Sequence, residues 1–277
     1  MGQKSWAAAV MAAALTVCAT PGNAEDVQPF VATHLSAMSV ETSARLRLNW
    51  TEIAFRGDRP KAWDEITSPE LRASIRLQLG MFEGKLELGG VEDLFDRHPR
   101  SNTRTLRAEL QAGVVFGDWA VLAEWKPRNV FAPGFDDFLV GLDSYDIKLR
   151  NRFALSLMPD LPRANVQATV AAGYVAALPD IFRRDFVEVE VEIVQRLSQD
   201  FALTIAPKLE LSNYLNFPGG DDRQDAAFSV RIVPAANLGN GVTISVEGQA
   251  LIAVSTRESK TGENWAVTPI LRLQKSL

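Results

Sequence analysis

The chain has 277 residues, a mean hydropathy of -0.03 and a formal net charge of -5 at pH 7. A mildly acidic chain without a block of basic residues argues against a nucleic-acid partner. No run of about 20 consecutive apolar residues follows residue 24, which excludes a helical membrane span and leaves a soluble chain or one that crosses a membrane as strands.

Residues 1–24 have the pattern of a secretory signal peptide: Lys4 supplies the positive charge, an apolar stretch follows, and small residues form the cleavage site. Cys18 is the only cysteine, so no disulfide is expected in the exported protein. We expect residues 25–43 to form an N-terminal segment in the periplasm or in the lumen of a barrel. Residues 44–277 are then the barrel domain.

Short segments of alternating apolar and polar residues fill the rest of the chain. The connections after odd-numbered segments are long and rich in turn residues, as in 57–60 and 218–221, whereas 80–81 and Gly117 are brief connections after even-numbered segments. An up-and-down barrel with both termini in the periplasm has this asymmetry. We therefore predict an all-β fold, a transmembrane antiparallel up-and-down β-barrel of about 12 strands. The predicted strands are residues 44–56, 70–80, 82–90, 103–116, 118–127, 143–157, 162–177, 185–197, 200–213, 225–234, 240–254 and 264–275.

Each predicted strand has one apolar and one polar face. In 70–80, for example, Leu71 and Leu77 alternate with Arg72 and Arg76. This alternation suits either a soluble sheet over a core or a barrel with lipid outside and a polar lumen. The bulky apolar residues of all strands would crowd a single core, so we favour the membrane barrel. A soluble periplasmic β-protein is the less favoured interpretation.

The last segment, from Trp265 to Leu277, alternates to its end, with Leu271, Leu273 and Leu277 on its apolar face. It resembles the C-terminal strand by which Gram-negative outer-membrane barrels are recognised for insertion, although Leu277 stands where an aromatic residue is usual. The resemblance implies a porin-like architecture in the outer membrane. It also implies contact with membrane lipid, lipopolysaccharide and the barrel-insertion machinery.

The prediction about enzymatic activity depends on where the two histidines lie in the sequence. Outer-membrane phospholipase and the lipid A deacylases resemble one another in placing a His and a Ser on the barrel wall. Here His34 precedes the first predicted strand, and His98 lies in a loop beside Asp96. We interpret His98 as a solvated loop histidine, which is a simpler interpretation than a metal ligand. We therefore predict no catalytic residues, no metal site, no cofactor and no enzymatic activity.

The polar faces of the strands would line the lumen and set its selectivity. A passive channel for small polar or charged solutes is therefore the predicted function, with segregated charges creating a field across the lumen. The alternative is a closed, salt-bridged barrel whose external loops bind a partner or lipopolysaccharide. The predicted lumen residues are Arg45, Arg47, Arg72, Arg76, Lys148, Arg150, Arg152, Glu188, Glu190, Glu192 and Arg272.

Overall fold

The computed structural model describes residues 37–53, 62–96, 99–132, 137–157, 159–216, 223–240, 242–257 and 261–276; the side chains at 37–53, 62–65, 101, 262–266 and 272–276 are not among those described. The predicted signal peptide, His34 and His98 lie outside the described residues. In the described part of the chain, no helix is long and apolar enough to cross a membrane.

The described residues form an antiparallel barrel in which every strand pairs with its neighbours in the chain. The last strand pairs with the first, from Glu41 opposite Ser276 to Thr51 opposite Ala266, and this pairing closes the sheet. The predicted all-β up-and-down barrel is therefore confirmed. The strands are β1 (Ala37–Ile53), β2 (Ala62–Leu79), β3 (Phe82–Phe95), β4 (Thr103–Phe116), β5 (Trp119–Phe131), β6 (Phe138–Leu155), β7 (Ala164–Leu178), β8 (Arg184–Arg196), β9 (Phe201–Tyr214), β10 (Arg223–Gly239), β11 (Val242–Ser255) and β12 (Gly262–Ser276).

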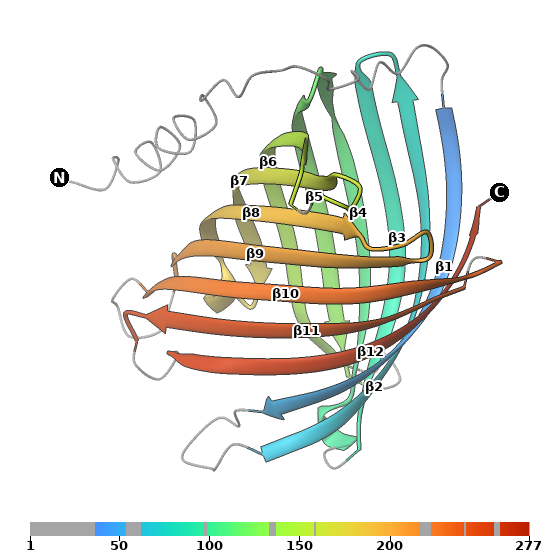
Figure 1. Ribbon diagram of the computed structural model, residues 1–277. Helices are drawn as coiled ribbons and strands as arrows, with labels where there is room; N and C mark the ends of the chain where they lie inside the picture. The colour runs from blue at the N-terminus through green and yellow to red at the C-terminus, as the bar shows by residue number, and fades with distance from the viewer. Residues whose placement is uncertain are drawn as a thin grey trace.

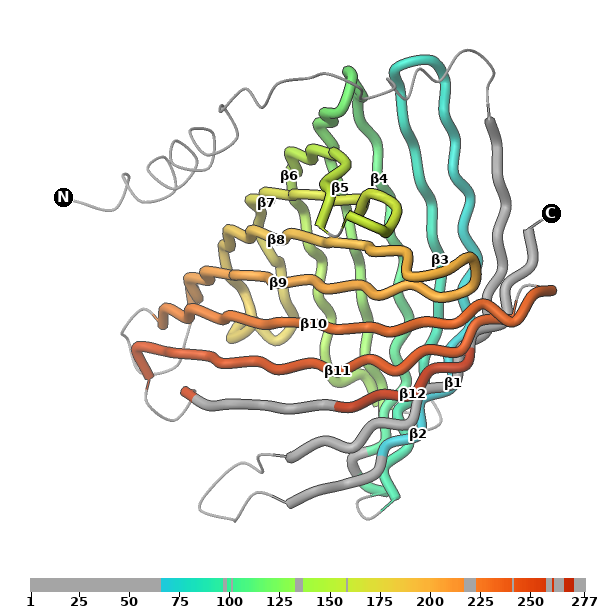
Figure 2. The backbone as a smooth tube through the Cα atoms, in the orientation of Figure 1, coloured from blue at the N-terminus to red at the C-terminus, as the bar shows by residue number. Residues whose placement is uncertain are grey.

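The strands change direction steadily around the sheet, from steep in β3 and β4 to nearly horizontal in β9 to β12 (Figure 1). Strand tilt of this kind accompanies the closure of a twisted sheet. The backbone trace in Figure 2 shows β2 and β3 rising together as one hairpin at the top of the view. Short 3-10 turns at Pro99–Ser101 and Asp180–Phe182 lie in two of the connections.

Brief turns join most of the even-numbered strands to the next strand. Gly80 and Gly117 have φ of 59° and 61°, a left-handed conformation that glycine adopts without steric cost. The predicted pattern of brief connections after even-numbered strands fails once, because the connection between β6 and β7 runs from residue 156 to 163. Pro159 and Pro162 fall within it, and a proline has no N–H to donate to the ladder. Pairing therefore stops earlier here than the apolar pattern indicates.

The first hairpin is longer than predicted. β1 and β2 pair without a break from Ala37 opposite Gln78 to Ile53 opposite Ala62. Residues 37–43 are therefore part of the barrel wall, not of a separate N-terminal segment. Alternation between 37 and 43 is weak in the sequence, and the pairing partner that extends the strand becomes visible only in the folded sheet.

Exposure shows which face of the barrel meets its surroundings. Leu71 and Ile147 are 69% and 64% exposed, and they lie on the outer face. The carboxylates of Glu70, Glu124 and Asp146 alternate with such residues and are buried inside. A soluble barrel needs the reverse arrangement, because its apolar side chains must leave water. The apolar face of this closed sheet is its outer surface.

Candidate functional site: the charged lumen

The inner surfaces of β2, β3 and β4 carry a continuous ion-pair network. The carboxylate of Glu70 has no exposed surface and contacts the guanidinium groups of Arg72 and Arg107. Nη1 of Arg72 also lies 3.2 Å from Oε1 of Glu87. Lys85 extends the network, with Nζ 3.0 Å from Glu87 and 2.8 Å from Glu109. The predicted lumen residue Arg72 is thus held by two carboxylates.

A second network joins β5 and β6. Glu124 and Asp146 are opposite each other in the strand register and have 2% and 1% side-chain exposure, so they would repel each other strongly if left alone. Nζ of Lys126 lies 2.5 Å from Glu124 and 3.1 Å from Asp146. Lys148, a predicted lumen residue, lies 2.6 Å from Glu124. Two lysines therefore neutralise two buried carboxylates.

The partly exposed glutamates of the β8 ladder meet cations on the next two strands, β9 and β10. Oε2 of Glu188 lies 2.7 Å from Nζ of Lys208 on β9. On β10, Nη2 of Arg231 lies 3.9 Å from Glu190 and 3.0 Å from Glu192. The glutamates of β8 are consequently paired locally with cations, and charges of both signs are mixed around this part of the lumen.

One ion pair spans two intervening strands. Arg150 on β6 donates to both carboxylate oxygens of Glu83 on β3, at 3.2 and 2.7 Å. Beside it, the side chain of Leu122 on β5 is buried. Gly113 makes this possible, since a Cβ there would lie 2.7 Å from Cδ2 of Leu122. This half of the lumen, toward the short turns, is narrowed by direct side-chain contacts.

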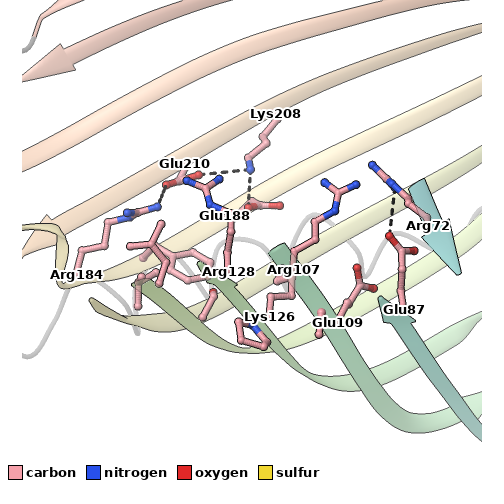
Figure 3. A pocket seen from close by; sticks show the side chains of 16 residues that line it. Arg72, Glu87, Arg107, Glu109, Lys126, Arg128, Arg184, Glu188, Lys208 and Glu210 are labelled. Atoms are coloured by element: carbon pink, nitrogen blue, oxygen red, sulfur yellow. Dashed lines mark hydrogen bonds and ion pairs between the residues drawn. The ribbon is translucent and has the colours of Figure 1, made fainter. Parts of the chain in front are cut away.

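The other half of the lumen, toward the long connections, contains a cavity of about 360 Å³. Charged side chains enter it from both walls (Figure 3). Six are cationic and four are acidic, so its charged lining carries an excess of positive charge. We call this space the outer cavity; it is lined by Arg72, Glu87, Arg107, Ala108, Glu109, Lys126, Pro127, Arg128, Leu142, Ser144, Val175, Arg184, Phe186, Glu188, Lys208 and Glu210.

The structure distributes the predicted lumen residues over several places. Arg72 and Glu188 line the outer cavity. Nε of Arg152 donates to Gln167 at 2.9 Å. The backbones of Arg45 and Arg272 are directly opposite each other where β1 meets β12, as the predicted adjacency of these strands requires. The side chains of Arg45, Arg47 and Arg272 lie outside the described residues.

Sequence reasoning missed several cations of the outer cavity, including Arg128, Arg184 and Lys208. The predicted strand 118–127 ended at Pro127, whereas β5 continues to Phe131 and holds Pro127 opposite Asp143 in the sheet. Continuing the alternation past this proline places Arg128 on the same face as Lys126. That signal was present in the sequence.

An outward apolar face, an inward charged face and closed antiparallel pairing together define a transmembrane β-barrel of the outer-membrane type. The protein is therefore an outer-membrane barrel whose outer face contacts lipid. A soluble periplasmic β-protein is inconsistent with apolar side chains such as Leu71 and Ile147 on the outer surface. By the rule for such barrels, the short turns face the periplasm and the long connections face outward.

No protein-family model matches the chain, and no curated protein matches it. Among solved structures, it is similar to the translocator domain of the autotransporter NalP from Neisseria meningitidis, with 13% identity over 96% of each chain and a TM-score of 0.45. It is also similar to the NanC porin, with 9% identity over 82% of this chain and 98% of that one and a TM-score of 0.43. A third is LpxR from Salmonella typhimurium, with 8% identity over 85% of this chain and 99% of that one and a TM-score of 0.46.

The prediction that the chain is not an enzyme is contradicted. The solved structures similar to this chain include LpxR as well as the NanC porin, and at identities of 8% and 9% the enzymatic status of this barrel is unresolved. The histidines on which the prediction depended also lie outside the described residues. Within the described part of the chain, no group of three or more His, Cys, Asp and Glu side chains is placed to hold a metal ion.

Proposed function

We propose that this outer-membrane barrel is a passive channel for small polar or charged solutes, whose selectivity is set by the charged side chains of its lumen. The observation that carries the proposal is the outer cavity, a space of about 360 Å³ bounded by charged side chains inside a closed barrel. The charged groups of this lining can replace the water molecules that hydrate a polar solute. The contact between Arg150 and Glu83 would then be the narrow part of the path.

A second candidate is a closed barrel whose external loops bind a partner or lipopolysaccharide. The bidentate pair between Arg150 and Glu83, together with buried Leu122, favours it, because these contacts narrow the inner half of the lumen. The alternation of β12 supports the further proposal that the insertion machinery recognises this strand. The two candidates share the fold and differ in whether ions pass.

Conductance across a planar lipid bilayer separates the candidates. A channel gives discrete steps of current in potassium chloride, and its reversal potential in a salt gradient reports its selectivity. Replacing Arg45, Arg47, Arg72 and Arg76 with Gln should move that potential toward cation selectivity. Absence of current steps from correctly folded protein would reject the channel, and an unchanged reversal potential would reject the role of these arginines.

A further inference from the structure

The outer cavity has chemistry that a general polar channel does not require. We propose that Arg128, supported by Arg184, forms a binding subsite there for small organic monocarboxylates that carry an apolar body. This inference rests on the proposed function and specifies which solutes the channel takes.

Arg128 differs from the other cations of the outer cavity. In the described part of the chain, it has no ion pair or hydrogen bond, and its side chain is exposed. By contrast, Arg72 and Lys208 are held by carboxylates at 3.2 and 2.7 Å. The carboxylate of Asp93 on β3 acts on Arg128 electrostatically but forms no ion pair with it, so the guanidinium group can still offer both of its N–H pairs to one bound carboxylate.

Arg184, the second cation of the subsite, is only weakly held. Among the described residues, its nearest carboxylate oxygen is Oε1 of Glu210, 3.8 Å from Nη2. Its Nε is buried and has no hydrogen-bond partner in the part of the chain that the structure describes. Figure 3 shows Arg184 and Arg128 among the side chains of the same cavity. Two cations facing one space repel each other, and a bound anion relieves that repulsion.

The carboxylates of the cavity limit the charge of the solute. Glu188 and Glu210 are both within reach of Lys208, at 2.7 and 3.4 Å. These two acids neutralise the positive charge of Lys208 and would repel a second negative charge on the ligand. A single carboxylate therefore suits the cavity better than a dianion.

Apolar side chains make up another part of the lining, contributed by Pro127, Leu142, Val175 and Phe186. Phe186 is able to pack close to the wall because the adjacent Gly173 has no side chain: a Cβ there would lie 2.8 Å from Cζ of Phe186. A convergent cation with an apolar wall is the usual composition of a small-molecule site. It favours a carboxylate with an apolar body over an inorganic anion.

Benzoate is the probe that tests this inference, with acetate and benzyl alcohol as partial analogues. Calorimetric titration of the barrel in detergent should show benzoate binding more tightly than either analogue. Arg128→Gln should weaken benzoate binding by about 10- to 100-fold, the usual effect of losing a charged hydrogen-bond donor. Arg128→Lys should retain part of the affinity, since it keeps the charge and loses the planar fork.

Arg196→Gln is the matched control, because it removes one positive charge at the short-turn end of β8, away from the cavity. It should leave benzoate affinity unchanged, and heat-modifiable gel migration verifies that each variant is folded. Equal benzoate affinity in Arg128→Gln and the natural chain would overturn the subsite, as would failure of benzoate to bind. Binding that depends on Arg128 without any channel current would support the subsite and reject the channel.

Discussion

Arg150 on β6 and Glu83 on β3 join parts of the lumen wall that are separated by β4 and β5, with two nitrogen-to-oxygen contacts at 3.2 and 2.7 Å. Arg150 is 7% exposed, so its charge depends on this carboxylate for compensation. The pair therefore links two strands that do not touch through the backbone ladder.

We expect Glu83→Gln to lower the free energy of unfolding by about 1–3 kcal/mol, because it leaves a buried guanidinium without its counter-charge. Urea unfolding in lipid vesicles measures this change. The control is Glu92→Gln, which removes the carboxylate of a half-exposed pair with Arg104 and should cost under about 0.5 kcal/mol. If both variants lose the same stability, the lumen pair has no special structural role.

The orientation of the apolar face is tested by placing a charge on it. Ile147 lies at the middle of β6 and is 64% exposed. Ile147→Arg should destabilise the barrel in a bilayer by about 2–4 kcal/mol, since arginine there faces hydrocarbon. Leu94→Arg, near the long-connection end of β3, should cost only about 0–1 kcal/mol. A charge tolerated equally at both positions would show that water, not lipid, contacts this face.

Gly173 is required for close packing between β6, β7 and β8. A Cβ at this position would lie 2.4 Å from the carbonyl oxygen of Tyr145 and 2.7 Å from Cβ of Asp146. Gly173→Ala should therefore lower the free energy of unfolding by about 1–3 kcal/mol. In Gly84→Ala the nearest atoms lie at 3.9 Å, and little change is expected. Similar urea midpoints for the two variants would contradict this account.

If the barrel conducts, single charges of the lumen should shift its selectivity in opposite directions. Arg76 has no ion pair or hydrogen bond within the described residues, so Arg76→Gln should move the reversal potential toward cations. Glu247 forms a loose ion pair, with Oε2 3.9 Å from Nη1 of Arg231. Glu247→Gln should move the reversal potential toward anion selectivity. Both potentials are read in one salt gradient. Shifts of the same sign would show that these charges do not act on the permeating ions directly.

Much of the barrel could be predicted from local pattern. The strand at 103–116 was placed at the bounds observed for β4, and the faces of β2, β6 and β8 were assigned correctly, because alternation is a property of each strand alone. Prolines marked the limits of this reasoning. Pro127 is accommodated within β5, whereas Pro159 and Pro162 lie in a connection, and only the paired strands distinguish these cases.

The sequence by itself therefore determined the class of fold, a strand number of about 12 and the inward faces of β2, β6 and β8. The tertiary structure decided which inward charges meet. Glu83 and Arg150 are 67 residues apart in the chain, and closure of the sheet brings them together. Local alternation fixes a side chain's face, but the curvature and register of the whole barrel fix its partners. For that reason the ion pairs, the outer cavity and the position of Arg128 in that cavity become visible only in the folded protein.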